Sequence, residues 1–181
     1  MFACIIDMAY LCWQRALDIR TLMESQIRPG PQGLVGGSLT FVPSKTSRTS
    51  RIAIEITITP AIANVIERAR TAKQQHMVVS SYLFAITGGP NIGQPFTKAK
   101  LFKMWDLARD RASKEAKQEG RDFDASIQFR DLRAPGAMDA AAKGEDWGEI
   151  QKRLAHTSER NTGIYIKKVI PKVSALDTAL P

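Results

Sequence analysis

The sequence predicts an α+β fold: a mostly helical domain with a small antiparallel β-sheet of three strands on one side. Three observations support this prediction. Helix-type patterns occupy the first 23 residues, strand-type patterns follow in the next part of the chain, and several helix-type patterns fill the rest. The chain has 181 residues, of which 44% are hydrophobic and 24% charged, enough for one domain with a sizeable core.

The strands are predicted from short apolar runs and from alternation. Residues 39–42 are apolar, and isoleucine alternates with small or polar residues over 52–58, which gives one buried face. The polar and basic stretch 43–51 between them predicts a β-hairpin with a cationic tip. A third strand is predicted at 81–85. The segment 29–37 is rich in glycine and proline and is predicted to be an irregular connection.

Helix boundaries are predicted from capping residues and chain breakers. The N-terminal helix pattern breaks near Trp13. Thr59 and Pro60 are a cap and a first-turn proline for a helix that runs to about residue 75. Thr97 caps a long amphipathic helix that ends before a glycine. Three more helices are predicted over residues 131–143, 146–154 and 159–168.

Charge and cysteine content bound the partners and the compartment. The formal net charge of +8 favours an acidic partner such as nucleic acid. Cys4 and Cys12 lie in an apolar stretch and are predicted to be buried thiols in a reducing compartment, so we expect the cytoplasm. The apolar N-terminal stretch is broken by Asp7 and is too short to span a membrane. His76 and His156 stand alone, so no metal site is predicted.

A set of cations and one tyrosine follow one another in a distinctive order. Gln14-Arg15 comes first, Arg130-Asp131-Leu132-Arg133 follows, then Leu154-Ala155-His156-Thr157, and Tyr165 lies nine residues after His156. A phosphodiester under attack gains negative charge on its non-bridging oxygens, and guanidinium groups bind two such oxygens at once. This set therefore suits attack of a tyrosine on a DNA phosphate. Taken singly, each arginine has a simpler interpretation as an exposed salt-bridge residue.

These motifs, in this order, resemble the catalytic domain of the tyrosine recombinases, the phage-integrase family. The resemblance implies that Tyr165 is the nucleophile, and that Arg15, Arg133 and His156 stabilise the charge on the phosphate. It also implies that Lys45, on the predicted hairpin, protonates the departing 5′ oxygen. Three further residues are expected to support the reaction. Asp18 would orient Arg15, and Arg48 and Arg51 would contact the DNA backbone.

The sequence departs from the family pattern at several positions. Arg130 stands where the family most often has histidine, and arginine cannot act as a base. It would instead clamp the phosphate or lower the pKa of the tyrosine, which leaves the general base unassigned. Cys12-Trp13 replaces a frequent Thr-Gly pair. Pro135 follows Arg133 so closely that we expect it to kink or delay the helix there.

The resemblance implies site-specific DNA recombination, with DNA cleaved and rejoined through a 3′-phosphotyrosyl link and with neither metal nor nucleotide cofactor. Residues 1–168 would be the catalytic domain, and residues 169–181 a tail that docks on a neighbouring subunit. We expect the family's N-terminal DNA-binding domain to be absent, so that DNA affinity is weak. The expected partners are double-stranded DNA and further copies of the chain, from dimer to tetramer, but no membrane and no small-molecule substrate.

Three alternatives remain open from the sequence. The first is a catalytically weak or inactive DNA-binding remnant of an integrase. The second is an enzyme that relaxes DNA as type IB topoisomerases do, and the third is an unrelated helical binding protein whose motifs match by chance. The target DNA sequence is not predicted, because contacts to the DNA backbone carry no sequence information.

Overall fold

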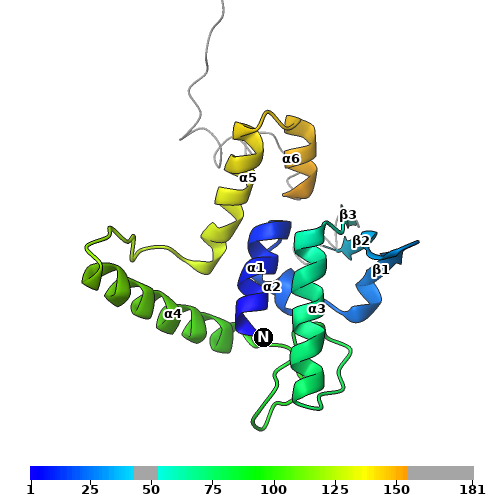
Figure 1. Ribbon diagram of the computed structural model, residues 1–181, viewed down its shortest axis with the longest axis horizontal. Helices are drawn as coiled ribbons and strands as arrows, with labels where there is room; N and C mark the ends of the chain where they lie inside the picture. The colour runs from blue at the N-terminus through cyan, green and yellow to red at the C-terminus, as the bar shows by residue number, and fades with distance from the viewer. Residues whose placement is uncertain (43–52, 155–181) are drawn as a thin grey trace, which may run out of the picture.

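The computed structural model describes residues 1–42 and 53–154 (Figure 1). Within them lie six α-helices, two 3₁₀ turns (η1 and η2) and one sheet of three strands. In chain order the elements are α1 (Phe2–Cys12), α2 (Ala16–Arg20), η1 (Glu24–Gln26), β1 (Ile27–Gly30), β2 (Gly33–Phe41), β3 (Ile54–Thr57), α3 (Pro60–Gln75), α4 (Lys98–Gln118), η2 (Phe129–Leu132), α5 (Arg133–Ala142) and α6 (Trp147–Arg153). The predicted α+β class is confirmed.

Helices α1 and α3 lie side by side and form the centre of the main core (Figure 1). The side chains of Ile5 and Met8 on α1 and of Ile62 and Ile66 on α3 are fully buried there. Helix α3 begins and ends as predicted, because the Thr59 hydroxyl accepts a hydrogen bond from the backbone N–H of Ile62 at 3.4 Å and Pro60 occupies the first turn. The break near Trp13 is also confirmed, since α1 ends at Cys12.

The three strands are antiparallel in the order β1-β2-β3. Strand β3 alternates as predicted: Ile54 and Ile56 are buried, and Glu55 and Thr57 are exposed. Its pairing with β2 confirms the predicted hairpin. The cationic tip of that hairpin lies outside the described residues.

Two sequence predictions about the sheet are wrong. The segment 29–37 is not an irregular connection, because most of it belongs to the β1–β2 hairpin. A Cβ on Gly37 would lie 2.1 Å from the carbonyl oxygen of Arg28, so glycine allows the two backbones to approach. Residues 81–85 form no strand but only single bridges, from Tyr82 to Met23 and from Ala85 to Pro95. This run is apolar because it fills the core, with Leu83 fully buried.

Helix α4 packs on the main core through its N-terminal half. The Thr97 hydroxyl caps it as predicted, accepting from the backbone N–H of Lys100 at 3.1 Å. Leu101 and Trp105 are buried, and the Trp105 ring meets Phe129 edge-on at 5.6 Å. The C-terminal half of the helix extends away from α1 and α3 (Figure 1). None of the helices described is long and apolar enough to cross a membrane.

Helices α5 and α6 form a hairpin beside the C-terminal end of α1 (Figure 1). Helix α5 begins at Arg133, two residues later than predicted, after the 3₁₀ turn η2. Pro135 is therefore in the first turn, where a backbone N–H has no helical partner and its loss costs little. Helix α6 is confirmed, and the Asp146 carboxylate caps it by accepting from the backbone N–H of Glu149 at 3.0 Å.

Candidate active site

The first motif lies where the chain turns from α1 into α2. Trp13 adopts φ 57°, the left-handed conformation that ends α1 and redirects the chain. Gln14 follows and is 1% exposed. Arg15 is the N-cap residue of α2, and Asp18 lies in the first turn of that helix with an exposed fraction of 8%. The turn at Trp13 thus sets the direction of Arg15.

Arg133 joins three of the predicted motifs. Its Nε donates a hydrogen bond to the carbonyl oxygen of Trp13 at 2.6 Å, and its Nη2 donates to that of Leu154 at 2.7 Å. Trp13 precedes Gln14-Arg15, and Leu154 opens the motif that contains His156. Arg133 is only 8% exposed, so the interpretation of this arginine as an exposed salt-bridge residue is wrong.

The Arg15 side chain has a hydrogen-bond donor that the described part of the protein does not use. Its Nη1 is buried and has no hydrogen-bond partner among the described residues. Charge-assisted hydrogen bonds between a guanidinium and a phosphate are strong ones. The predicted role of Arg15 as a phosphate ligand, and that of Asp18 in orienting it, stay predictions.

Arg130 lies on the surface. It belongs to the 3₁₀ turn η2, its side chain is 77% exposed, and its Nε is 3.7 Å from a carboxylate oxygen of Asp131. Exposure costs this ion pair most of its strength, so the guanidinium can exchange partners. Its predicted role toward the phosphate stays a prediction.

Two residues of this region were missed by the sequence interpretation. The Gln14 side-chain amide donates to the carbonyl oxygens of Cys12 at 3.0 Å and Arg153 at 2.5 Å. Arg153 donates from Nη2 to the carbonyl oxygen of Leu11 at 2.9 Å, and its guanidinium lies over the Trp13 ring at 4.9 Å. The only signal in the sequence is position: Gln14 belongs to the first motif, and Arg153 directly precedes the motif that contains His156.

The described cysteine and tyrosine nearest this region are poor nucleophiles. Burial raises the pKa of the Cys12 thiol to about 12, although the charge of Arg153 opposes that shift. The Tyr10 hydroxyl donates to a carboxylate oxygen of Asp139 at 2.8 Å, and this hydrogen bond raises its pKa. Within residues 1–42 and 53–154, no group of side chains has the composition of a metal site.

The remaining predicted site residues lie outside the described part of the chain. They are Lys45, Arg48, Arg51, His156 and Tyr165. The predicted helix 159–168 and the tail 169–181 lie outside it as well.

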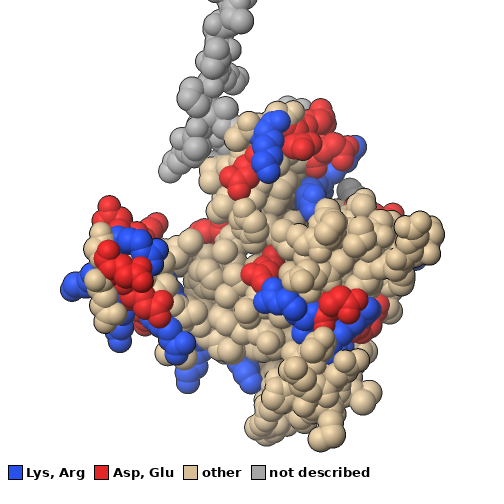
Figure 2. All heavy atoms as spheres, in the orientation of Figure 1, with Lys and Arg blue, Asp and Glu red and all other residues tan. Residues whose placement is uncertain are grey.

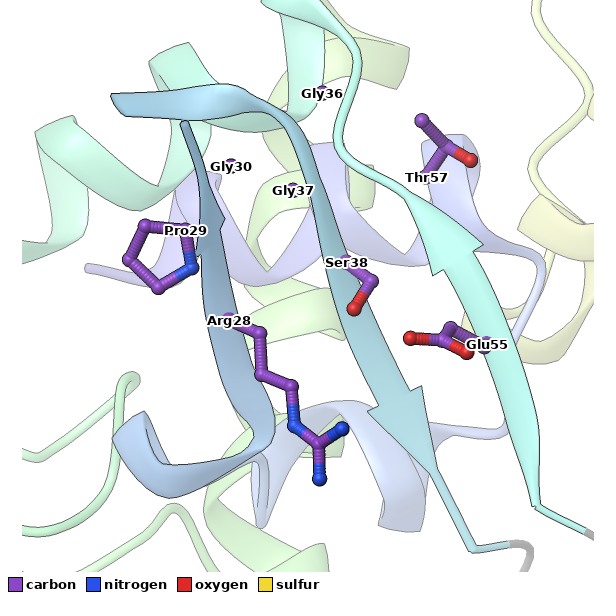
Figure 3. Close-up of a pocket in the computed structure, with 8 residues that line it drawn as sticks. All are labelled: Arg28, Pro29, Gly30, Gly36, Gly37, Ser38, Glu55 and Thr57. Carbon is purple, nitrogen blue, oxygen red and sulfur yellow. The ribbon is translucent and has the colours of Figure 1, made fainter. Parts of the chain in front are cut away.

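A separate hollow of about 500 Å³ lies on the exposed face of the sheet (Figure 3). Arg28 and Glu55 point to this side, with Ser38 and Thr57 beside them. The two opposite charges leave the hollow without a net preference for an anion. None of the predicted site residues lines it.

Comparison with protein families identifies the class. The model of the phage integrase family matches residues 2–169, nearly the whole chain, so the protein belongs to the phage integrase family. A search of curated protein sequences returns no significant match.

Solved structures with the same fold include three DNA-bound recombinases. XerH site-specific recombinase, bound to its palindromic difH substrate after cleavage, aligns with a TM-score of 0.64 and 16% identity over 91% of this chain and 41% of its own. A lambda integrase tetramer bound to a Holliday junction aligns with a TM-score of 0.65 and 17% identity, over 96% of this chain and 45% of its own. The Tn1549 transposon integrase with circular intermediate DNA aligns with a TM-score of 0.66 and 13% identity, over 90% of this chain and 53% of its own. The chain thus spans about half the length of these proteins and shares their fold.

Proposed function

We propose that residues 1–168 are the catalytic domain of a site-specific DNA recombinase that cleaves and rejoins DNA through a 3′-phosphotyrosyl intermediate. One observation carries this proposal: the buried Arg133 ties together the backbone segments that lead into Arg15 and into His156. A motif match by chance gives no reason for these segments, more than a hundred residues apart, to meet at one guanidinium. Membership of the phage integrase family supports the same reaction.

In the proposed mechanism the Tyr165 hydroxyl gives its proton to a base other than Arg130, and the Tyr165 oxygen attacks the scissile phosphorus in line. The bond from phosphorus to the 5′ oxygen breaks, a 3′-phosphotyrosyl link forms, and Lys45 gives its proton to the departing oxygen. Arg15, Arg133 and His156 stabilise the charge that grows on the non-bridging oxygens, with Arg130 as a further cation. A 5′ hydroxyl from a second strand then reverses the step. The covalent link conserves the bond energy, so the reaction uses no nucleotide.

The proposed partners are double-stranded DNA and other copies of the chain. The lambda integrase structures, solved as a dimer on a core site and as a tetramer on a Holliday junction, support both. The tail 169–181 is proposed to dock on a neighbouring subunit, and Arg48 and Arg51 to contact the DNA backbone. We place the reaction in the cytoplasm, where the buried, unpaired thiols of Cys4 and Cys12 would stay reduced.

Capture of the covalent intermediate tests the proposal. The chain is incubated with a pool of nicked duplexes of random sequence, in which cleavage near the nick releases a short strand and traps the enzyme on DNA. We expect denaturant-stable adducts with the wild type and none with Tyr165→Phe, which keeps the ring but lacks the nucleophilic oxygen. Lys152→Ala, which removes an exposed cation, is the control and should form adducts normally.

The outcomes separate the alternatives. Adducts that depend on Tyr165, followed by joining to a new strand, support a recombinase. Adducts with relaxation of supercoiled plasmid but no new joints would instead identify a topoisomerase-like activity. DNA binding by a folded wild-type chain without any adduct would contradict the proposal and identify a DNA-binding remnant.

A further inference from the structure

We propose that Arg153 is a positioning residue: stacked on Trp13, it holds the end of α6 against the end of α1 and so sets the geometry of Arg133 and Arg15. This inference rests on the proposed function. It assigns a role to two side chains outside the predicted site.

The C-terminal ends of α1 and α6 converge, which creates an electrostatic problem (Figure 1). The last carbonyl groups of a helix have no partner within it and carry the negative end of its dipole. Two such ends brought together repel each other unless donors lie between them. Helix α1 has no basic residue in its own last turn to supply them.

Side chains from other segments supply these donors. Arg153 donates to the carbonyl oxygen of Leu11 at the end of α1, and Gln14 donates to those of Cys12 and Arg153. Arg133 donates to Trp13 and Leu154, one carbonyl from each side. Arg153 therefore bonds to the chain on both sides of Trp13: its guanidinium donates to Leu11, and its backbone carbonyl accepts from Gln14. We define these contacts as the Arg153 clasp.

Trp13 completes the Arg153 clasp in a conformation that suits glycine. A side chain at φ 57° is strained, so a bulky residue there needs a compensating contact. Its ring carries the Arg153 guanidinium at 4.9 Å on one side. It also packs so closely on α5 that a Cβ on Gly136 would lie 2.0 Å from the indole nitrogen. Trp13 thereby joins α1, α5 and α6.

The contribution of Arg153 to the stability of the fold does not explain its position. Its Nε is buried and has no hydrogen-bond partner among the described residues. The guanidinium is partly buried, and a partly buried charged group with an unsatisfied donor adds little to the stability of a fold. Its advantage is precision, because the planar guanidinium stacks and donates in fixed directions. Movement of α6 would shift the Leu154 carbonyl away from Arg133 and change the direction of that guanidinium.

Single-turnover cleavage tests this role, on a nicked duplex that the wild type cleaves. For Arg153→Ala we expect the adduct to form roughly ten- to a hundredfold more slowly at saturating DNA, since a small misplacement of reacting groups has that effect. DNA affinity should stay within about twofold of wild type, and the final yield of adduct should be unchanged. Lys152→Ala is the matched control: it removes one cation from the same helix, at a side chain 75% exposed, and should match wild type.

Variants at Trp13 test the stack itself. Trp13→Phe keeps a flat ring under Arg153 and should retain most of the rate. Trp13→Gly fits the backbone conformation but removes the ring, and should slow cleavage as Arg153→Ala does. The double variant should be no slower than the slower single one, because both remove the same contact.

Three results would overturn the inference. Arg153→Ala could cleave as fast as Lys152→Ala, which would leave the proposed function intact. It could instead lose final yield in proportion to its unfolded fraction while keeping the wild-type rate, which would make Arg153 only structural. A folded wild type that forms no adduct would overturn the proposed function, and the positioning role with it.

Discussion

At the scale of single residues, the candidate site depends on two arginines that bond to backbone carbonyls. Arg133 and Arg153 together donate three hydrogen bonds to carbonyl oxygens at or beside the ends of α1 and α6. Hydrogen bonds that involve a charged group contribute about 1.5–3 kcal/mol each. Such bonds also fix the plane of a guanidinium, which is what bidentate binding of a phosphate requires.

Gly136→Ala is expected to destabilise the protein. Alanine usually stabilises a helix interior by about 1 kcal/mol relative to glycine, but here its Cβ would lie 2.0 Å from the Trp13 indole nitrogen and 2.9 Å from the Tyr10 carbonyl oxygen. Forcing an extra carbon into a packed contact costs about 1–3 kcal/mol, so the clash outweighs the gain. Urea unfolding measures the difference. Gly88→Ala is the control, because open space surrounds that Cβ; equal stability of the two variants would contradict the packing.

The Cys12 thiol is expected to be unreactive in the folded protein. Burial raises its pKa to about 12, so almost no thiolate exists at neutral pH, and the thiolate is the reactive form. Cys4 is buried too. A disulfide reagent that releases a coloured thiol should therefore modify both cysteines at pH 8 only on unfolding in urea. Rapid modification of the native protein would show that α1 opens readily.

At the scale of elements, a three-residue ion cluster joins η1 to α3. Glu24 accepts hydrogen bonds from Arg70 Nη2 at 2.8 Å and from Lys73 Nζ at 2.6 Å. Lys73 also donates to the carbonyl oxygen of Tyr82 at 3.1 Å, so it ties the segment after α3 to the same cluster. Only 9% of the Lys73 side chain is exposed, so the carboxylate of Glu24 compensates a largely buried charge.

Glu24→Gln is expected to destabilise the protein by about 1–3 kcal/mol at pH 7 and by much less at pH 3. Burial alone would raise the pKa of Glu24, but Arg70 and Lys73 outweigh it and hold that pKa below its ordinary value of 4.5. The stabilisation is therefore present above pH 4.5 and is lost as the pH falls through the lower native pKa. Urea unfolding between pH 3 and 7 measures it.

The exposed Glu67 on α3 supplies the control for that experiment. Glu67→Gln removes the same charge, at an exposed position of the helix that carries Arg70 and Lys73, and should leave the stability nearly unchanged. A difference between Glu24→Gln and wild type that stays constant with pH would contradict the ionic origin of the effect.

At the scale of the whole molecule, the net charge of +8 is spread unevenly. Figure 2 shows Lys and Arg on α4 and beside α3, interspersed with Asp and Glu, and a neutral surface at the lower end of the view. Helix α4 extends its charged C-terminal half into solvent, held by few contacts. Helix α4 carries seven Lys or Arg residues and three Asp or Glu residues, and an excess of cations attracts the DNA backbone at a distance and releases counterions on contact.

DNA binding is expected to weaken steeply with salt. The logarithm of the association constant falls with the logarithm of the salt concentration with a slope of about −0.9 for each phosphate neutralised. We expect the affinity to fall by about tenfold or more between roughly 50 and 200 mM salt, because the proposed contact with the DNA backbone involves several cations at once. Fluorescence anisotropy with a labelled duplex measures the slope. A slope near zero would contradict an electrostatic contact with the DNA backbone.

Much of the fold and part of the site were predicted from local signals. The cap formed by Thr59 and Pro60 and the alternation around Ile54 each act within a few residues, so sequence alone reveals them. The β1–β2 hairpin was not predicted, because glycine signals a turn as well as a close approach of two strands. The run 81–85 was misassigned, since a short buried segment has the same apolar pattern whether or not it forms a strand.

The sequence by itself determined the class of protein, the order of the motifs and the identity of the predicted reacting groups, because these depend on residue types and spacing. Only the tertiary structure decided which side chains hold the site together. The contacts of Arg133 with Trp13 and of Arg153 with Leu11 join residues more than a hundred positions apart. They form because two helix ends meet in space and their carbonyl groups need donors, a requirement that no local pattern expresses.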